Sequence, residues 1–236
     1  FVLRSRGKVV MIDTCIGADR QREFEVFCNL QTTFLEDMEA AGFPPKEVSA
    51  VLCTHLHFDH VGWNTRLVDG KWVPTFPQAR YFFGRREWEH WKHLRETNGY
   101  HHMEHLGDSI DPVVEAGLVE LIEPDFRITD EVSLIPTPGH TPGHVSVLIR
   151  SRGEEAVITG DMMHHPIQLA VPHIPGNFDM DKEQGVRTRL EFIKRFSGQP
   201  TLVIGSHFPE PTAGWIVPDG DVWKLVTEWD RDADKA

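Results

Sequence analysis

The segment Thr54–Asn64 reads THLHFDHVGWN and carries four side chains that can bind a metal ion, namely His55, His57, Asp59 and His60. Neutral imidazole and carboxylate are ligands that suit zinc, and also iron, manganese or cobalt. The alternative interpretation is a histidine-rich turn in contact with solvent. The rest of the chain decides between the two, because a complete site needs further ligands.

Three more metal-capable residues follow apolar runs that are typical of buried strands. SLIPTPGH ends at His140, AVITGD ends at Asp161, and TLVIGSH ends at His207, just as AVLCTH ends at His55. Because strand ends meet along one edge of a sheet, we expect these residues to come together. The seven candidate ligands are too many for one tetrahedral zinc. They suit two ions, which would lie roughly 3.5–4 Å apart.

The order of apolar patterns is typical of a layered α/β or α+β chain, which we expect to form a single domain over residues 1–236. Strands are predicted over 7–14, 48–55, 117–122, 131–136, 144–150, 155–159 and 201–206. Helices are predicted over 23–41, 84–96, 181–197 and 221–230, with a polar connection at 64–78 that leads to the run ARYFF. The stretch GYHHMEHLGDSI has no clear pattern.

The composition limits the class of partner. A net charge of −12 opposes binding to nucleic acids and to anionic membranes, whose phosphates attract basic surfaces. Three cysteines are too few for a disulfide framework, so a reducing, cytoplasmic compartment is expected. The chain starts without methionine inside an apolar run, so we expect N-terminal strands, and with them any signal peptide, to be missing. The sequence leaves the oligomeric state open, a homodimer included.

The motifs together resemble the metallo-β-lactamase superfamily. The resemblance is carried by the segment from His55 to His60, then Pro138-Gly139-His140, Gly160-Asp161 and Ser206-His207, in the order of the family. It extends from VVMIDTCIG at 9–17 to SHFPEPTAGW at 206–215. It implies an α+β fold, an αββα sandwich of two mixed sheets flanked by helices, with the metals at one edge.

The resemblance also implies a role for each ligand. His55, His57 and His140 would hold the first metal, and Asp59, His60 and His207 the second, with Asp161 bridging them. Asp13, in the IDTCIG turn, matches a family position that supports the site without binding metal. The run PGHTPGH offers both His140 and His144 for one ligand position; the family pattern favours His140 and leaves His144 a structural hydrogen-bonding role.

Within the superfamily, the spacing and the HTPGH signature are most similar to the metal-dependent lactonases and the branch of methyl parathion hydrolase. Those proteins hydrolyse lactones, esters or phosphotriesters. Homoserine lactonases place a tyrosine three residues after the bridging aspartate, whereas this chain has His164 there. The histidine is closer to the branch of methyl parathion hydrolase. We expect His164, in preference to His165, to donate a hydrogen bond to the developing oxyanion.

The expected function is hydrolysis of a lactone or carboxylic ester by hydroxide bound to two divalent metals, with zinc as the first choice. Asp59 and Asp161 are expected to orient the nucleophile and carry its proton, with His164 as the third catalytic residue. An acidic chain with several tryptophans favours a small, neutral, apolar substrate. A phosphotriesterase is the main alternative, and a β-lactamase, a thioesterase or a non-catalytic metal-binding module are less favoured.

A second group of histidines, interleaved with glutamates, follows no apolar strand. Its members are His90, His93, His101, His102 and His105. We interpret this group as a solvated helical face rather than as a second metal site.

Overall fold

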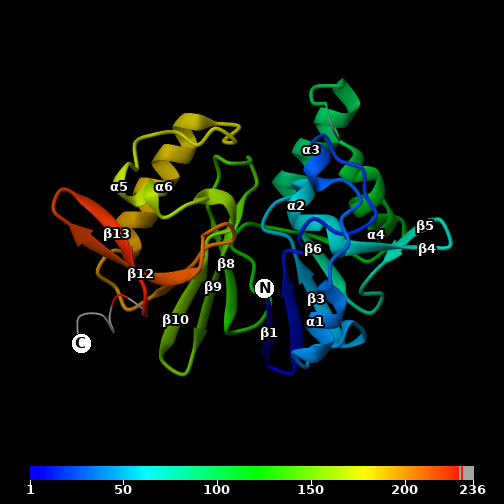
Figure 1. Cartoon of the computed structure of the whole chain (residues 1–236), viewed down its shortest axis with the longest axis horizontal. Coiled ribbons are helices and arrows are strands. Elements are labelled where there is room, and N and C mark those ends of the chain that lie inside the picture. The colour runs from blue at the N-terminus through cyan, green and yellow to red at the C-terminus, as the bar shows by residue number, and fades with distance from the viewer. Residues whose placement is uncertain (102, 229, 231–236) are drawn as a thin grey trace. The chain divides into compact units, whose positions relative to one another are not determined.

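The computed structural model describes residues 1–101, 103–228 and 230, and the chain divides into two compact units, Phe1–Glu123 and Pro124–Ala236. Each unit has its own large sheet and its own hydrophobic core (Figure 1). The predicted combination of mixed sheets flanked by helices, an α+β class, is therefore confirmed. In the part of the chain that the structure describes, no helix is long and apolar enough to cross a membrane.

The first unit is built on a five-stranded sheet with the order β1-β2-β3-β6-β7. Its strands are β1 (Val2–Ser5), β2 (Lys8–Ile12), β3 (Val48–Leu52), β6 (Arg80–Gly84) and β7 (Val119–Ile122). The last four run parallel to one another, and β1 pairs antiparallel with β2. Nearly every residue of β2 and β3 is buried, which is typical of parallel strands and explains their continuous apolar runs.

The helices of the first unit share one core with its sheet. They are α1 (Phe34–Ala40), α2 (Phe58–Val61), α3 (Arg85–Thr97), the π-helical turn η4 (Leu106–Ile110) and α4 (Asp111–Glu115). Short 3₁₀ turns are η1 (Glu25–Phe27), η2 (Pro45–Glu47) and η3 (Gly62–Asn64). Trp91 of α3 and Ile110 of η4 belong to the same core as Tyr81 and Phe83 of β6. The predicted helix at 84–96 is confirmed, and the stretch without a clear pattern contains η4.

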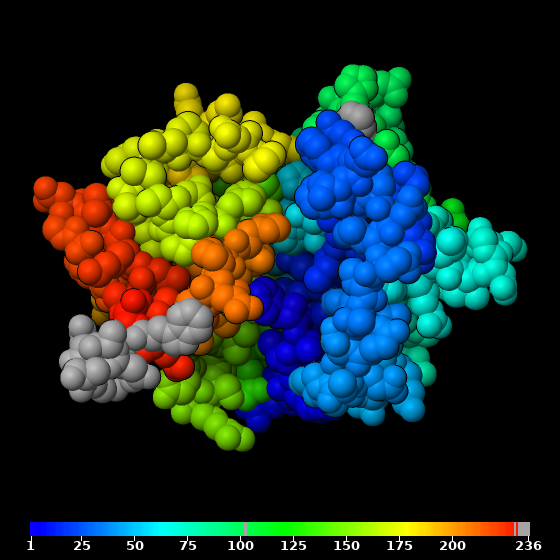
Figure 2. Space-filling view, viewed as in Figure 1, coloured from blue at the N-terminus to red at the C-terminus, as the bar shows by residue number. Residues whose placement is uncertain are grey.

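A small hairpin replaces the polar connection predicted at 64–78, so that prediction was wrong. Its strands are β4 (Thr65–Val68) and β5 (Lys71–Pro74), and Figure 2 shows them in cyan, projecting from the rest of the unit. Asp69 and Gly70 form the turn with φ values of 49° and 74°, as two-residue hairpin loops require. The buried Arg20 guanidinium lies 4.1 Å from the Trp72 ring and pairs with Asp108 at 2.8 Å, which fastens the hairpin to η4.

The second unit is built on a six-stranded sheet with the order β13-β12-β11-β10-β9-β8. Its strands are β8 (Val132–Pro136), β9 (Val145–Ser151), β10 (Glu154–Ile158), β11 (Leu202–Ile204), β12 (Ala213–Asp219) and β13 (Val222–Val226). Only the β10–β11 pair is parallel in this sheet. The turn η5 (Gly160–Met162) follows β10, and the short helix α5 (Ile167–Ala170) lies between η5 and α6 in the sequence.

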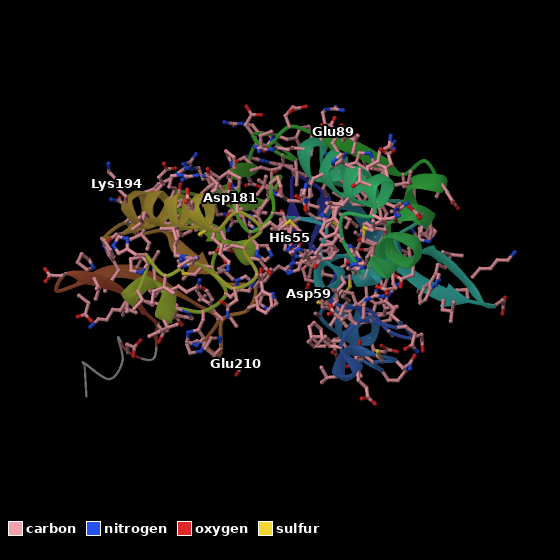
Figure 3. All side chains as sticks on the ribbon, turned by 90° about the horizontal axis from the view of Figure 1, so that it is seen from above. His55, Asp59, Glu89, Asp181, Lys194 and Glu210 are labelled. Atoms are coloured by element: carbon pink, nitrogen blue, oxygen red, sulfur yellow. The ribbon has the colours of Figure 1, made fainter. Side chains whose placement is uncertain are left out.

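Helix α6 (Lys182–Phe196) confirms the helix predicted over 181–197. Asp181 caps its N-terminus by accepting a hydrogen bond from the Gln184 amide at 2.9 Å. Figure 3 labels Asp181 at the start of the helix and Lys194 near its end. The buried stripe has helical spacing and consists of Gly185, Thr188, Arg189, Phe192, Ile193 and Phe196. Val186 and Leu190, which the apolar pattern placed on the buried face, are only half-buried beside it.

Two predicted helices differ from the structure. Over 23–41 only η1 and α1 are helical, because Asn29 between them adopts a left-handed conformation with φ of 51° that ends any helix. Within 221–230, residues 222–226 form β13, which pairs antiparallel with β12, so only residues 228 and 230 are helical among the described residues, and residue 229 lies outside them. That prediction of a terminal helix was wrong.

We expect the first unit to become less stable as the pH decreases. The reason is the buried side chain of His105, which is 2% exposed. Burial, and to a smaller extent the nearby charge of Arg22, lower the pKa of His105 to about 4. The unfolded chain has a histidine pKa of about 6.5, so it takes up the proton first. Stability is therefore lost as the pH falls from about 6.5 to about 4.

The measurement is urea unfolding of the wild type and of His105→Asn at pH 8 and pH 5. The wild type should lose about 2 kcal/mol more than the variant over this interval, since the variant cannot take up the proton at position 105. Equal losses in both proteins would show that His105 is not kept neutral by burial.

Candidate metal centre

The first unit turns directly from β3 into the segment with the predicted ligands, where His55 and Asp59 lie near each other (Figure 3). His55 Nε2 and His57 Nδ1 are 3.0 Å apart, and His60 Nε2 is 3.7 Å from Asp59 Oδ2. Two atoms bound to one tetrahedral zinc at about 2.1 Å would themselves be about 3.4 Å apart. The separations within this unit therefore fit pairs of atoms that share an ion.

Asp13 orients His60. It follows β2 with a left-handed φ of 54°, and its carboxylate accepts hydrogen bonds from the Thr54 amide at 2.7 Å and the Thr54 hydroxyl at 2.8 Å. The same carboxylate accepts from His60 Nδ1 at 2.8 Å. Because an ionised carboxylate only accepts, the His60 proton is on Nδ1 and the lone pair is on Nε2. That is the form in which an imidazole binds a metal through Nε2.

His55 is oriented through the same contacts. The Thr54 hydroxyl donates a hydrogen bond to Asp13. The hydroxyl oxygen can therefore accept one from His55 Nδ1, which is 3.1 Å away. The lone pair of His55 then lies on Nε2, the atom next to His57. Glu87, which the sequence did not indicate, supports this segment from α3: its buried Oε1 accepts from the Leu56 amide at 3.1 Å and from the Trp91 indole at 2.8 Å.

In the second unit, three imidazoles surround the buried carboxylate of Asp161. Its Oδ2 lies 3.1 Å from His164 Nε2, 3.2 Å from His207 Nε2 and 3.5 Å from His140 Nε2. Ligand atoms of His140, Asp161 and His164 all lie within 4.8 Å of one another. The three ligands predicted for this unit thus come together. His164, for which the sequence predicts a catalytic role only, has the geometry of a further ligand.

His144 has a different role from His140. Its Nε2 accepts a hydrogen bond from the Asp161 amide at 2.9 Å, and its Nδ1 lies 2.9 Å from the Thr137 hydroxyl. Since Nε2 accepts, the proton is on Nδ1 and points to Thr137. His144 therefore fixes the backbone of Asp161 and does not present a nitrogen to a metal.

Asp179 lies on the other side of His140, and no motif in the sequence indicated it. Its Oδ1 is 3.6 Å from His140 Nδ1, and its Oδ2 is 3.5 Å from Arg189 Nη2 and accepts from the Gly176 amide at 2.9 Å. Burial alone would raise the pKa of Asp179, but His140, the Gly176 amide and Arg189 together hold that pKa below its usual value. Asp179 is therefore a buried carboxylate in its ionised form.

The second group of histidines is only partly solvated. His93 and His101 are exposed, His90 is half-buried, and His105 is buried, while His102 lies outside the described residues. Glu89, labelled on α3 in Figure 3, is exposed as expected. Among the described residues, no set of metal-ligating atoms gathers in this group.

Comparisons with known proteins identify the family of this chain. The model of the metallo-beta-lactamase superfamily matches residues 1–225. An N-acyl homoserine lactonase from Bacillus sp is 31% identical over 121 residues, which are 51% of this chain and 40% of that protein. The probable metallo-hydrolase YybB of Bacillus subtilis is 26% identical over 171 residues, covering 68% of this chain and 64% of the relative. The chain thus spans less than half the length of the lactonase.

Solved structures show the same fold. Hydrolase AbOPH, in the beta lactamase superfamily, has a TM-score of 0.75 at 26% identity. The match covers 93% of this chain and 75% of the AbOPH chain. AidC, a dizinc quorum-quenching lactonase solved with a product, has a TM-score of 0.74 at 21% identity. The match covers 95% of this chain and 77% of the AidC chain. Because the family model matches all but the last few residues, this chain belongs to the metallo-β-lactamase superfamily.

Proposed function

We propose that this chain is a metal-dependent hydrolase that cleaves a lactone or a carboxylic ester, and that its two units form one metallo-β-lactamase domain. The proposal rests above all on the proton positions in the first unit. Asp13 and Thr54 place the protons of His60 and His55 on Nδ1, so both imidazoles present Nε2 lone pairs beside further ligand atoms. Lone pairs that face one another in this way repel, and a bound cation would remove that repulsion.

The proposed site holds two divalent ions, with zinc as the first choice and iron, manganese or cobalt as alternatives. Its ligands are His55, His57, Asp59, His60, His140, Asp161 and His207. Within each unit these donors are imidazole nitrogens and carboxylate oxygens only, which is the chemistry that zinc prefers. The ions would supply Lewis acidity and would lower the pKa of a bound water toward neutrality.

Three side chains would then move or stabilise charge. The Asp59 side chain is 26% exposed, so it can accept a proton from the nucleophile and release it to solvent. Asp161 is almost fully buried and holds the positions of the imidazoles around it. His164 has a partly exposed ring whose Nε2 faces Asp161, from where it can donate a hydrogen bond to the developing oxyanion.

Apolar side chains next to the ligands support an apolar substrate. Phe178 is 70% exposed, and its ring lies 5.9 Å from that of His164. Ile167 and Ile174 are exposed in the same segment of the second unit. In the first unit, Phe58 lies within the ligand segment, and its ring is 5.7 Å from that of Phe27. Exposed aromatic and aliphatic side chains bind neutral, apolar groups better than anions.

A phosphotriesterase is the second candidate, because His164 stands where homoserine lactonases have a tyrosine. A phosphotriester is also neutral and would use the same ions and apolar surface. The two functions are separated by the substrate panel below.

The first test combines elemental analysis with hydrolysis of γ-lactones, aryl esters and a dialkyl aryl phosphate before and after chelation. We expect close to two equivalents of metal per chain and turnover that chelation abolishes and zinc restores. Lactone or ester turnover well above that of the phosphotriester supports the proposal, and the reverse order supports the second candidate. Turnover that chelation leaves unchanged would exclude a metal-dependent hydrolase.

A second test separates the roles of the two histidines in PGHTPGH. His140→Ala should lose at least one equivalent of metal, because it removes a ligand. His144→Gln should keep both equivalents, because a glutamine oxygen can still accept from the Asp161 amide. The loss of the Thr137 contact should cost about 1–3 kcal/mol of stability. Metal content and urea unfolding measure the two effects, and metal loss in His144→Gln alone would reverse the assignment.

A third test concerns the apolar surface. Phe178→Ala should lower kcat/KM about 10-fold for an ester or lactone with a long alkyl chain, since a buried phenyl ring contributes up to about 3 kcal/mol. Short-chain substrates should be affected much less. Leu67→Ala, which removes an exposed apolar side chain on the β4–β5 hairpin, is the matched control. An equal loss for both chain lengths would argue against contact between Phe178 and the chain.

A further inference from the structure

We propose that Asp179 is the positioning carboxylate of the metal ligand His140, and that Arg189 holds Asp179 in place. This inference rests on the proposed function, because it takes His140 as a ligand. The contacts that support it all lie within the second unit.

The geometry places His140 between two carboxylates with different roles. Asp161 Oδ2 lies 3.5 Å from Nε2 on one side of the ring, and Asp179 Oδ1 lies 3.6 Å from Nδ1 on the other. The 3.6 Å separation is longer than a hydrogen bond, but at this distance the negative charge of the carboxylate favours the tautomer with its proton on Nδ1. With the proton there, the lone pair lies on Nε2, the nitrogen that shares its surroundings with Asp161, His164 and His207. Carboxylate–histidine pairs of this kind orient metal ligands and make them more basic.

Two glycines lie directly against the Asp179 carboxylate. A Cβ on Gly176 would lie 2.7 Å from Asp179 Oδ2, and a Cβ on Gly185 would lie 2.6 Å from the same oxygen. Both distances are shorter than any real contact of a Cβ atom, so the two glycines form a cradle for the carboxylate. The Gly176 amide also donates to Oδ2 at 2.9 Å.

Backbone contacts bind the turn of Asp179 to the loop of His140. The Met180 amide donates to the His140 carbonyl at 3.1 Å, and the Asp181 amide donates to the Gly139 carbonyl at 2.9 Å. The position of the carboxylate relative to the imidazole is therefore set by two hydrogen bonds on adjacent residues.

Arg189 supplies the compensating charge. It is fully buried on α6, its Nη2 lies 3.5 Å from Asp179 Oδ2, and its Nη1 donates to the Pro172 and Ile174 carbonyls at 3.1 and 2.8 Å. A buried charge is stable only when it is paired, so the guanidinium stabilises the carboxylate at this place in the interior. The buried cation thus holds the Asp179 carboxylate beside His140.

The test compares Asp179→Asn with Asp181→Asn. Both changes remove one negative charge without changing size, but Asp181 caps α6 and contacts its own helix at Gln184. Zinc affinity is measured by competition with a chromophoric chelator, and unfolding by urea is recorded for each protein. We expect Asp179→Asn to bind one of its two zinc ions about 10–100-fold more weakly, with Asp181→Asn unchanged.

A spectroscopic measurement on the zinc-loaded wild type does not depend on how the variant folds. In a ¹⁵N-resolved spectrum of the histidine rings, His140 should carry its proton on Nδ1, with a signal shifted downfield by the carboxylate. In Asp179→Asn that signal should move upfield. A proton on Nε2 in the wild type, or unchanged zinc affinity in a folded Asp179→Asn, would overturn the proposal. If the wild type itself binds no metal, the proposed function fails, whatever the variants do.

Discussion

An imidazole binds a metal through one nitrogen only when its proton is held on the other. In the first unit this constraint is met by one carboxylate, Asp13, which accepts three hydrogen bonds at 2.7–2.8 Å. One of these fixes His60 directly and another fixes His55 through the Thr54 hydroxyl. The backbone conformation of Asp13 places its carboxylate where it can accept these bonds. Asp13 adopts a left-handed conformation at the end of β2, where a strained residue is tolerated because several hydrogen bonds hold it.

The same constraint explains why the two histidines of PGHTPGH differ. His144 accepts from the Asp161 amide through Nε2, so its lone pair is already used inside the protein. His140 has a carboxylate beside Nδ1 and a second carboxylate, Asp161, beside Nε2. Residue type and spacing are nearly identical for the two histidines, and only the hydrogen-bond partners distinguish a ligand from a support.

The sequence identified the metal-capable side chains that lie close together within each unit better than it identified the elements around them. The ligands follow buried strands, and continuous apolar runs such as that of β3 are recognisable without any knowledge of their neighbours. The β4–β5 hairpin was missed although Asp69-Gly70 is a strong turn signal, because the flanking residues are polar. The helix predicted at 221–230 is strand β13, since pairing with β12 outweighs a weak helical pattern.

Asp179 and Glu87 could not be found in the sequence at all. Neither lies in a motif, and 38 residues separate Asp179 from the Gly139–Thr141 turn that its segment holds in place, counted from residue 141 to residue 179. A lone acidic residue in a loop or on a helix is normally solvated, and only tertiary contacts show that these two are buried acceptors. Supporting residues are therefore the part of a metal site that depends most on the fold and least on local pattern.

The two units also build their ligand groups in different ways. The first unit takes four ligands from one segment of six residues, so a single carboxylate and its hydrogen bonds can orient them together. The second takes its ligands from the ends of β8, β10 and β11, which are far apart in sequence. Because these residues follow different strands, their positions depend on tertiary contacts and not on a shared local segment. The Asp179–Arg189 pair lies beside His140, and His144 accepts from the Asp161 amide, so these two buried polar groups support two of the three residues although apolar residues would pack there at lower cost.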